Sequence, residues 1–248
     1  LPEYGFVCQR IFFSYHVLVN LIILAESQRN RYSVFLKMIF FDFHHHNKNS
    51  VSGIYNAELG EHPSSGIFSA GIHPHHISGH NHETIKWLYE TAQKENCVAI
   101  GECGLDGLLA TDFQLQKEIF NRQILIANEV NKPVIIHCVR KFYELIPFKK
   151  IAKTPMIIHG FNKKEQLAKD MLKHDFYLSF GKSVLHNLSL QKLLEQFPVQ
   201  KMFLETDGQD FEIELLYRKT AELKKMTPEE LQEQIFTNLN NIGISVPE

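Results

Sequence analysis

Two kinds of pattern are missing from this chain of 248 residues, and each absence excludes a class of protein. There is no excess of charge of one sign, because 26 Lys and Arg residues face 28 Asp and Glu residues, for a formal net charge of -2. The chain therefore lacks the global positive field of a protein that grips duplex nucleic acid through many phosphates, so any nucleic-acid contact should be local. Hydrophobic runs long enough to span a membrane are also missing, and we expect no membrane partner.

Cysteine is scarce, with four residues in all. Cys8, Cys97, Cys103 and Cys138 form no CxxC pair and no spacing typical of a secreted disulfide framework. A reducing compartment is the simpler interpretation, and we expect a cytoplasmic protein. Cys103 and Cys138 each follow a polar residue in an apolar run, so alternation should turn them away from it as buried, unreactive thiols.

Histidine, by contrast, is abundant, with 14 residues. Neutral imidazole is the commonest metal ligand in proteins and a ready acid or base near neutral pH. The positions of the histidines matter more than their number, because a metal site needs several side chains that converge on one point.

The length fits one large domain. Residues 1–37 carry no cluster of chemistry-bearing residues, and Met38 stands directly before the apolar run 39–41. We therefore expect residues 38–248 to form the working domain and residues 1–37 to be an N-terminal extension. Upstream translated sequence is our preferred interpretation of this extension. The alternatives are a helical extension and a targeting segment, since the mostly apolar stretch 11–25 after Arg10 loosely resembles a secretory signal.

From residue 39 onward, apolar runs of strand length alternate with amphipathic segments of helix length, which indicates repeated βα units around a parallel sheet. The expected strands are 39–43, 51–57, 68–72, 97–101, 133–137, 155–159, 176–180 and 201–205. The expected helices lie near 82–95, 112–130, 140–150, 163–174, 188–196, 212–225 and 228–238, the last with Thr227 as N-cap and Pro228 at its first position.

This alternation predicts an α/β fold, namely a (β/α)8 TIM-type barrel in a distorted form. Only a short polar loop separates the runs 39–43 and 51–57, and it is too short to hold a crossover helix between parallel strands. We therefore expect a crossover helix near the beginning of the barrel to be shortened or missing.

Metal-capable side chains stand where six of the apolar runs end. The segments are DFHHH at 42–46, GIHPHH at 71–76, GECGLD at 101–106, IHC at 136–138, IHG at 158–160 and ETD at 205–207. In α/β barrels the carboxyl ends of the strands hold the active site, because the loops that follow them converge there. The sequence therefore predicts one metal centre at this end of the barrel.

Four histidines are candidate nitrogen ligands. His44 and His46 are two residues apart, so on an extended backbone they share one face while His45 points to the other. Alone, such a pair would more often be solvated or packed, and His137 or His159 alone would more often be a hydrogen-bonded core residue. Their common position at strand ends favours metal binding.

Two carboxylates complete the set of six candidate ligands. Glu102, between Gly101 and Cys103, is placed to bridge two ions with its two oxygens, which is the arrangement that two-metal hydrolysis needs. Asp207 ends the last apolar run and is suited both to bind metal and to orient or deprotonate a water. We predict Asp207 and Glu102 as catalytic residues; for Glu102 the alternative is a surface or salt-bridged carboxylate.

In their order along the chain, these motifs are similar to those of one known family. The chain has DxHxH at 42–46, GxHP at 71–74, GExGLD at 101–106, strand-terminal His137 and His159, and ETD at 205–207. Over about residues 38–240 it resembles the TatD-like metal-dependent deoxyribonucleases, within the amidohydrolase-type barrels. The resemblance implies that His44, His46, Glu102 and Asp207 hold one ion, and that Glu102, His137 and His159 hold a second.

The resemblance also implies a reaction and a cofactor. The reaction is hydrolysis of DNA phosphodiester bonds by a metal-activated water, on single strands or 3′ ends. The cofactor is one or two divalent ions per chain, with Mg²⁺ implied by the family and Zn²⁺ or Mn²⁺ as alternatives, because the donors are mostly nitrogen. No obligate protein partner is indicated.

Three segments depart from the family pattern and leave other functions open. Gly107-Leu108-Leu109 stands where the family commonly has an aromatic residue, Gly208-Gln209-Asp210 replaces a proline-containing turn, and the 47–67 region is short. One alternative is a metal-dependent hydrolase of a small phosphoester, lactone or amide. The other is a catalytically silent barrel that binds metal.

Substrate contacts are expected from residues next to these ligands. His73 and His75 flank Pro74 at a strand end, where they are placed to contact substrate or a water beside the metals, with a structural role as the alternative. Arg140 follows His137 by three residues and is suited to bind a phosphate oxygen, with a surface salt bridge as the alternative. Asp106 is expected to hold a loop or a histidine instead of a metal.

Overall fold

The computed structural model of the chain describes residues 40–50, 52–78 and 81–246. The chain divides into two units, Leu1–Ile39 and Phe40–Glu248, and the fold described below is that of the second unit. The expected N-terminal extension 1–37 and Cys8 lie outside the described residues, so the predictions made for them stay predictions.

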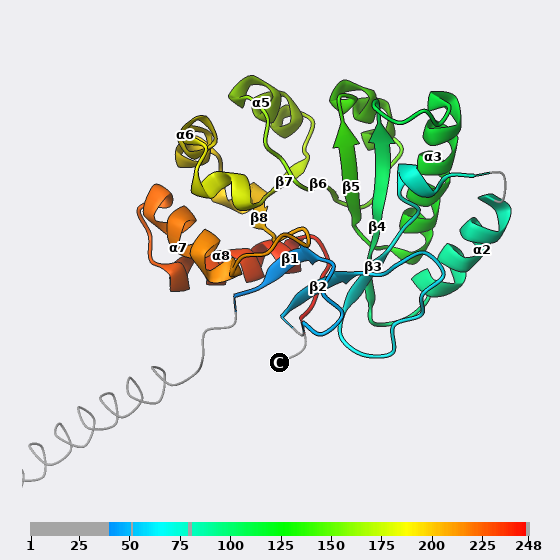
Figure 1. Ribbon diagram of the computed structural model, residues 1–248, viewed down its shortest axis with the longest axis horizontal. Coiled ribbons are helices and arrows are strands. Elements are labelled where there is room, and N and C mark those ends of the chain that lie inside the picture. Colours follow the sequence, from blue (N-terminus) through cyan, green and yellow to red (C-terminus); the bar gives the residue numbers. More distant parts are fainter. Residues whose placement is uncertain (1–39, 51, 79–80, 247–248) are drawn as a thin grey trace, which may run out of the picture. The chain divides into compact units, whose positions relative to one another are not determined.

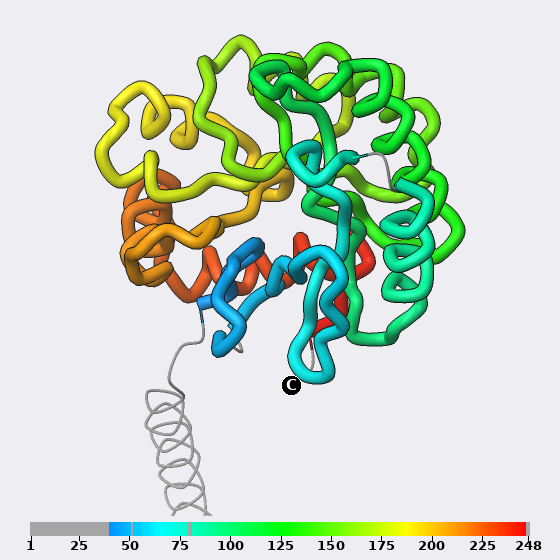
Figure 2. Tube along the Cα trace, turned by 45° about the vertical axis from the view of Figure 1, so that its right-hand side comes forward, coloured from blue at the N-terminus to red at the C-terminus, as the bar shows by residue number. Residues whose placement is uncertain are grey.

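Eight parallel strands form one sheet, in which each strand pairs with the next along the chain. They are β1 (Asp42–His45), β2 (Gly53–Asn56), β3 (Phe68–Ala70), β4 (Cys97–Asp106), β5 (Val134–Val139), β6 (Met156–Ile158), β7 (Tyr177–Phe180) and β8 (Met202–Leu204). The two edges meet where the amide of Asp207, after β8, donates to the carbonyl oxygen of His44 in β1 at 3.0 Å. The sheet is thus a nearly closed barrel, and the predicted fold class is confirmed (Figures 1 and 2).

Helices follow the later strands and form the outer layer of the barrel (Figure 1). The α-helices are α2 (Asn81–Ala92), α3 (Phe113–Val130), α4 (Ile146–Lys149), α5 (Glu165–Lys173), α6 (Leu188–Gln196), α7 (Ile213–Lys224) and α8 (Pro228–Asn241). The 3-10 helices are η1 (Pro74–His76), η2 (Phe142–Leu145), η3 (Lys182–Leu185) and η4 (Val199–Lys201). None of the described helices is long and apolar enough to cross a membrane.

Helix ends follow the local sequence closely. Thr227 caps α8 as expected, because its hydroxyl accepts the amide of Glu230 while the carboxylate of Glu230 accepts the amide of Thr227. The side chain of Asp112 caps α3, which ends where Asn131 adopts the left-handed conformation at φ 53°. The single helix expected at 140–150 is instead η2 followed by the short α4, since Pro147 cannot donate a hydrogen bond within a longer helix.

The early part of the barrel lacks crossover helices in two places in the described residues, where the sequence predicted one shortened or missing helix, between β1 and β2. The described residues of 46–52, between β1 and β2, contain no helix, and neither do residues 57–67, between β2 and β3. The two strands nevertheless pair in parallel. A strand of four residues is about 13 Å long, and seven extended residues reach about 23 Å, so a short loop is long enough to return along it.

The fourth strand is longer than predicted and carries the centre of the site. It continues from Cys97 to Asp106, and its register against β5 shifts between Ile100 and Cys103. Gly101 and Gly104 have φ of 150° and 148°, and a Cβ atom on either would collide with a carbonyl oxygen of β5. Glycine at both positions therefore lets β4 pass close to β5 on either side of Glu102.

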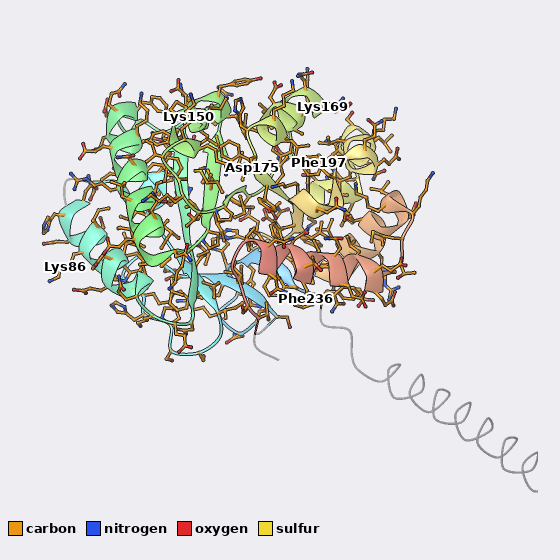
Figure 3. The ribbon with its side chains drawn as sticks, turned by 180° about the vertical axis from the view of Figure 1, so that it is seen from behind. Lys86, Lys150, Lys169, Asp175, Phe197 and Phe236 are labelled. Atoms are coloured by element: carbon orange, nitrogen blue, oxygen red, sulfur yellow. The ribbon has the colours of Figure 1, made fainter. Side chains whose placement is uncertain are left out.

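Aromatic side chains fill the space between the strands and the helices. Phe43 of β1 stacks on Phe203 of β8, with ring centroids 4.1 Å apart, and both are fully buried. The hydroxyl of buried Tyr217 in α7 donates to the carbonyl oxygen of Phe41. Viewed from behind, the barrel shows α8 with Phe236, whose ring meets that of Phe41 (Figure 3). This packing fixes the first strand, which carries two of the candidate ligands, against the last.

Candidate metal centre

The six predicted ligands converge at the carboxyl end of the barrel. Glu102 lies at their centre, with its Oε1 atom 2.8 Å from His137 Nδ1 and 2.8 Å from His159 Nε2. Its Oε2 atom lies 3.5 Å from His44 Nε2. The two oxygens of one carboxylate thus face different imidazoles, which is the geometry that a bridging ligand requires.

Asp207 adds a second carboxylate on the β1 side of the cluster. Its Oδ1 atom lies 3.5 Å from His46 Nε2 and 3.7 Å from His44 Nε2. The backbone of Asp207 has φ of 50° and is fixed by the hydrogen bond to the carbonyl oxygen of His44. Gly208 follows with φ of 68°, and a Cβ atom at this position would lie 3.3 Å from the side chain of His46. Asp207 is therefore held against both histidines of the first strand.

The donors at this site fit a divalent metal ion. Both ring nitrogens of His44 are fully buried, and neither has a hydrogen-bond partner among the described residues. Buried polar atoms are rarely left without partners, and an ordered ion is one way in which such atoms are satisfied. In two sets of three residues, one ligand atom from each residue lies within 4.8 Å of those of the other two. The sets are His44–His46–Glu102 and His44–His159–Asp207. Nitrogen and carboxylate donors at these distances suit Zn²⁺, Mn²⁺ or Mg²⁺.

The charges of this cluster stabilise one another. Burial opposes ionisation of Glu102, but the imidazoles of His159, His137 and His44 outweigh it and hold the pKa of Glu102 far below its usual range. Burial likewise opposes protonation of His159, yet the carboxylates of Glu102 and Glu205 raise its pKa well above the usual value. A proton on His159 thus balances the central carboxylate, and bound cations would take over that role.

The same balance holds around Asp207. Its carboxylate accepts a hydrogen bond from His46, which raises the pKa of His46 above its usual value. Burial of Asp207 opposes its ionisation, but the contact with His46 and the nearby rings of His159 and His44 lower its pKa overall. The side chain of Asp207 is 33% exposed, so it is open to solvent while that of His44 is not.

His73 lies closer to the centre than the sequence indicated. Its Nε2 atom is 3.5 Å from Glu102 Oε1, and its ring centroid is 4.2 Å from that of His137. These residues form a third set whose donors lie within 4.8 Å of one another. However, the Nδ1 atom of His73 accepts the amide of His75 at 3.1 Å, so the ring proton belongs on Nε2. His73 is therefore arranged as a hydrogen-bond donor toward the cluster and not as a metal ligand through Nε2.

Two carboxylates contact the candidate ligands His159 and His137 at the ring nitrogens that do not face Glu102. Glu205 is fully buried, accepts the amide of Gly160 and has its Oε1 atom 3.4 Å from His159 Nδ1. Asp106, which we expected to hold a loop or a histidine, does both. Its Oδ2 atom lies 3.3 Å from His137 Nε2, and its Oδ1 atom accepts the amide of Leu108. Such carboxylates orient ligand histidines and fix the position of their protons.

Sequence reasoning missed three residues that position the ligands. Besides Glu205, these are Asn56, whose Oδ1 atom accepts the amide of Glu102 at 2.9 Å, and Asp42, which accepts both the amide and the hydroxyl of Thr206. Burial raises the pKa of Asp42 to about 6 despite these hydrogen bonds. Asp42 and Glu205 stand two residues before a ligand in the DxHxH and ETD motifs. Alternation along an extended strand would have placed them on the same face as that ligand.

The remaining predicted residues lie at the rim. His75 is exposed, and its backbone amide, not its ring, contacts His73. Arg140 is exposed at the end of β5, with φ of 60°, and forms no ion pair with a carboxylate of the described residues. His45 points away from the cluster as expected: it is buried beside Tyr55, and burial lowers its pKa to about 4.

A cavity of about 400 Å³ opens beside the cluster. Its lining comes from the loops after β1, β2 and β3 and from the centre itself: His46, Asn56, Ala57, Glu58, Leu59, Gly71, His73, His75, His76 and Glu102. The volume falls within the range of pockets for small ligands. A ligand in this cavity would therefore contact Glu102 and His73 directly.

Comparison with solved structures confirms the fold. One is the crystal structure of YJJV, a TatD homolog from Escherichia coli K12, with a TM-score of 0.70 at 20% sequence identity over 85% of this chain and 100% of that one. Another is a hydrolase TatD family protein from Entamoeba histolytica, with a TM-score of 0.66 at 14% identity over 84% of this chain and 99% of that one.

Comparison with curated sequences identifies the family. The chain is 30% identical to the uncharacterized metal-dependent hydrolase YabD of Bacillus subtilis over 185 residues, which is 66% of this chain and 72% of that protein. It is 34% identical over 153 residues to the 3′-5′ ssDNA/RNA exonuclease TatD of Pantoea ananatis and spans 56% of that relative's length. Residues 26–242 match the family described as TatD related DNase. The chain therefore belongs to the TatD-related DNase family of metal-dependent hydrolases, as its motifs predicted.

Proposed function

We propose that this chain is a metal-dependent phosphodiesterase that removes nucleotides from an end of single-stranded nucleic acid. The observation that carries the proposal is the position of Glu102, whose two carboxylate oxygens face separate groups of imidazoles at 2.8–3.5 Å. Relatives that are 33–34% identical are named 3′-5′ ssDNA/RNA exonucleases, which supports single strands and the 3′ end as the substrate.

We assign the six ligands to two ions. His44, His46, Glu102 and Asp207 would hold one, and Glu102, His137 and His159 the other. When bound, such a pair of ions lowers the pKa of a water and neutralises the charge that develops on the phosphoryl group. Mg²⁺ is the ion that the family implies, while the four imidazole donors favour Mn²⁺ or Zn²⁺. Comparison of the metals therefore belongs in the test.

The residues of the chain have separate tasks in this proposal. Asp207 is partly exposed beside the cluster, so its carboxylate can contact a water and accept a proton from it. His73 directs Nε2–H toward the cavity and can donate to a phosphate oxygen as negative charge develops there. Asn56 holds the backbone of Glu102, which keeps the bridging carboxylate in place. His75 and Arg140 remain candidates for contact with the rest of the substrate.

The direct test is hydrolysis of a 5′-labelled single-stranded DNA of twelve nucleotides, and of the matching RNA, by the whole chain. Mg²⁺, Mn²⁺, Co²⁺ and Zn²⁺ are supplied separately, with a chelator as control. We expect stepwise shortening of the strand with at least one metal, loss of this activity in Glu102→Ala, and full activity in Lys86→Ala, which alters an exposed residue of α2.

Two results would overturn the proposal. If no metal supports shortening of either nucleic acid while a panel of small phosphoesters, lactones and amides is hydrolysed, the site acts on small molecules. If the folded protein hydrolyses nothing, the barrel is catalytically silent. A cytoplasmic location also remains our proposal, and the free thiols of Cys97, Cys103 and Cys138 support it.

A further inference from the structure

Positive charge is concentrated on one side of the barrel mouth, by which we mean the surface formed by the loops after the strands. The loops after β5, β6 and β7 carry a group of cations that we call the basic arc: Arg140, Lys141, Lys163, Lys164 and Lys182. Because these strands are consecutive neighbours in the sheet, their loops lie side by side. The only carboxylate among residues 140–145, 160–164 and 181–187 is Glu144.

None of the five cations forms an ion pair with a carboxylate of the described residues. Lys163 donates to the side chain of Asn162, and Lys182 donates to the carbonyl oxygen of Asp210. Two exposed lysines on the outer helices are paired, Lys86 with Glu90 and Lys169 with Glu165. Lys150 and Lys192, which are also exposed, form no ion pair among the described residues. The charge of the basic arc is thus left available to an anionic ligand.

Two aromatic rings lie beside these cations. The ammonium group of Lys141 is 4.4 Å from the ring centroid of Phe113, and that of Lys182 is 5.7 Å from the ring centroid of Phe211. Both rings are partly exposed. Cationic groups interleaved with aromatic rings are common features of grooves that bind single-stranded nucleic acid without base specificity.

The rest of the mouth has the opposite character. The loop after β8 carries Asp207, Asp210 and Glu212. In the loops after β1 and β2, Lys48 is neutralised by Glu58 and Glu61, both at 3.4 Å. The cavity beside the metal centre lies on this side and includes apolar Ala57 and Leu59 among its histidines. This side is suited to one base and sugar, and unsuited to a row of phosphates.

We propose that a single-stranded nucleic acid crosses the mouth in one direction, with its phosphate chain on the basic arc and its terminal nucleotide in the cavity. The phosphate between the two parts then lies at Glu102, which belongs both to the centre and to the cavity lining. This inference rests on the proposed function. It adds that one side of the mouth binds the phosphate chain of the nucleic acid and that the other side binds its terminal nucleotide. It also accounts for the binding of a polyanion by a chain with a net charge of -2.

The test compares two variants of equal charge change. The arc variant is Arg140→Ala/Lys163→Ala/Lys164→Ala, and all three residues are exposed. Lys164 is the N-cap residue of α5 but its side chain makes no capping hydrogen bond, so its loss should leave the helix intact. The control variant, Lys86→Ala/Lys169→Ala/Lys150→Ala, removes three exposed lysines from outside these loops (Figure 3). Far-ultraviolet circular dichroism checks that both are folded, and Lys163→Gln/Lys164→Gln repeats the test with milder substitutions.

Binding is measured by fluorescence anisotropy of a labelled twelve-nucleotide single strand at several salt concentrations, with a chelator present so that no cleavage occurs. Each lost phosphate contact should reduce the slope of log Kobs against log salt by about 0.7. We therefore expect the arc variant to lose about 2 from this slope and at least tenfold in affinity at low salt. The control variant should match the unmodified chain.

Kinetics give a second readout. For each variant, the KM for a twelve-nucleotide strand is compared with the KM for a dinucleotide. The arc variant should raise KM for the long strand at least tenfold and leave the dinucleotide unchanged, because the dinucleotide has no phosphates beyond the centre. Equal losses for both lengths, or equal losses in the arc and control variants, would overturn the proposal. If the unmodified chain cleaves nothing, the proposed function fails, while the anisotropy measurement still decides the binding path.

Discussion

Asp42 in the first strand and Thr206 after the last strand are joined by two hydrogen bonds. The carboxylate of Asp42 accepts the amide of Thr206 at 2.9 Å and its hydroxyl at 2.6 Å. The two residues are 164 positions apart in the chain, and each stands next to or near a candidate ligand, His44 in one case and Asp207 in the other. These two hydrogen bonds join the edges of the barrel, and therefore also constrain the distance between the candidate ligands His44 and Asp207.

Thr206→Val tests this closure. Valine keeps the shape of threonine but removes the hydroxyl donor, which leaves the buried carboxylate of Asp42 with only the amide. A hydrogen bond to a charged group contributes about 1.5–3 kcal/mol, so we expect the free energy of unfolding to fall by about 2 kcal/mol. Guanidinium denaturation followed by circular dichroism measures it.

Thr237→Val is the matched control, because the hydroxyl of Thr237 is exposed on α8 and donates only to the carbonyl oxygen of Glu233. Its effect should remain within about 0.5 kcal/mol. Equal midpoints for Thr206→Val and the unmodified chain would show that the bond contributes nothing to closure.

Glu205→Gln tests whether Glu205 orients the candidate ligand His159. Glu205 Oε1 lies 3.4 Å from His159 Nδ1, and the carboxylate is fully buried, so its removal weakens the orientation and basicity of His159. Substitution of such a residue lowers metal affinity about 10–100-fold. Calorimetric titration of the whole chain with Mn²⁺ or Zn²⁺ measures the loss without any nucleic acid. Glu212→Gln, exposed in the same loop, should bind metal as the unmodified chain does; an equal loss in both variants would mean that net charge, and not orientation, is responsible.

The sequence was sufficient to predict that the six candidate ligands lie together, because each ends an apolar run. Strand ends of a parallel barrel meet, so position alone brought Glu102, His137 and His159 into one cluster without knowledge of their distances. The order of the strands also followed from the alternation of runs and helices. Among the strands only the boundaries moved, as in β4, where Gly101 and Gly104 allow the strand to continue past Glu102 along β5.

The supporting residues could not be found in this way. Asn56 meets Glu102 across 46 positions, and Glu205 meets Gly160 across 45, and both contacts depend on the register between strands. A shift of one residue would turn each side chain to the other face. The position of the ring proton of His73 could not be predicted either. It is fixed by the amide of His75 in the turn of η1, and sequence periodicity does not reveal that contact.

The cysteines of the described chain should be inert. Burial raises the pKa of Cys97 to about 11 and that of Cys138 to about 12, and it raises the pKa of Cys103 as well. At pH 8 a thiol of pKa 11 is ionised in about one molecule in a thousand, and the thiolate is the reactive form. In a Cys8→Ser variant, Ellman's reagent should detect no thiol in the folded protein and three in guanidinium. Rapid reaction of any of the three in the folded protein would show that its strand opens to solvent.

His73→Ala separates a hydrogen-bond donor from a metal ligand. If Nε2–H donates to a phosphate oxygen, its loss should lower kcat about 100-fold, as the loss of one donor in an oxyanion site does. Metal affinity should stay unchanged. Because Nδ1 accepts the amide of His75, the ring proton is on Nε2, and the nitrogen that faces the cluster has no lone pair for a metal. His73→Gln, which keeps an N–H near the same position, should recover part of the rate.

The matched comparisons for His73 are His137→Ala and His82→Ala. His137 lies 2.8 Å from Glu102 and is a candidate ligand, so its loss should weaken metal binding in the same calorimetric titration. His82 is exposed on α2, and its loss should change neither quantity. A fall in metal affinity for His73→Ala as large as that for His137→Ala would place His73 among the ligands and assign its ring proton to Nδ1. The donor role requires the opposite result, a loss of rate at constant metal affinity, because only then does His73 act on the substrate and not on the ion.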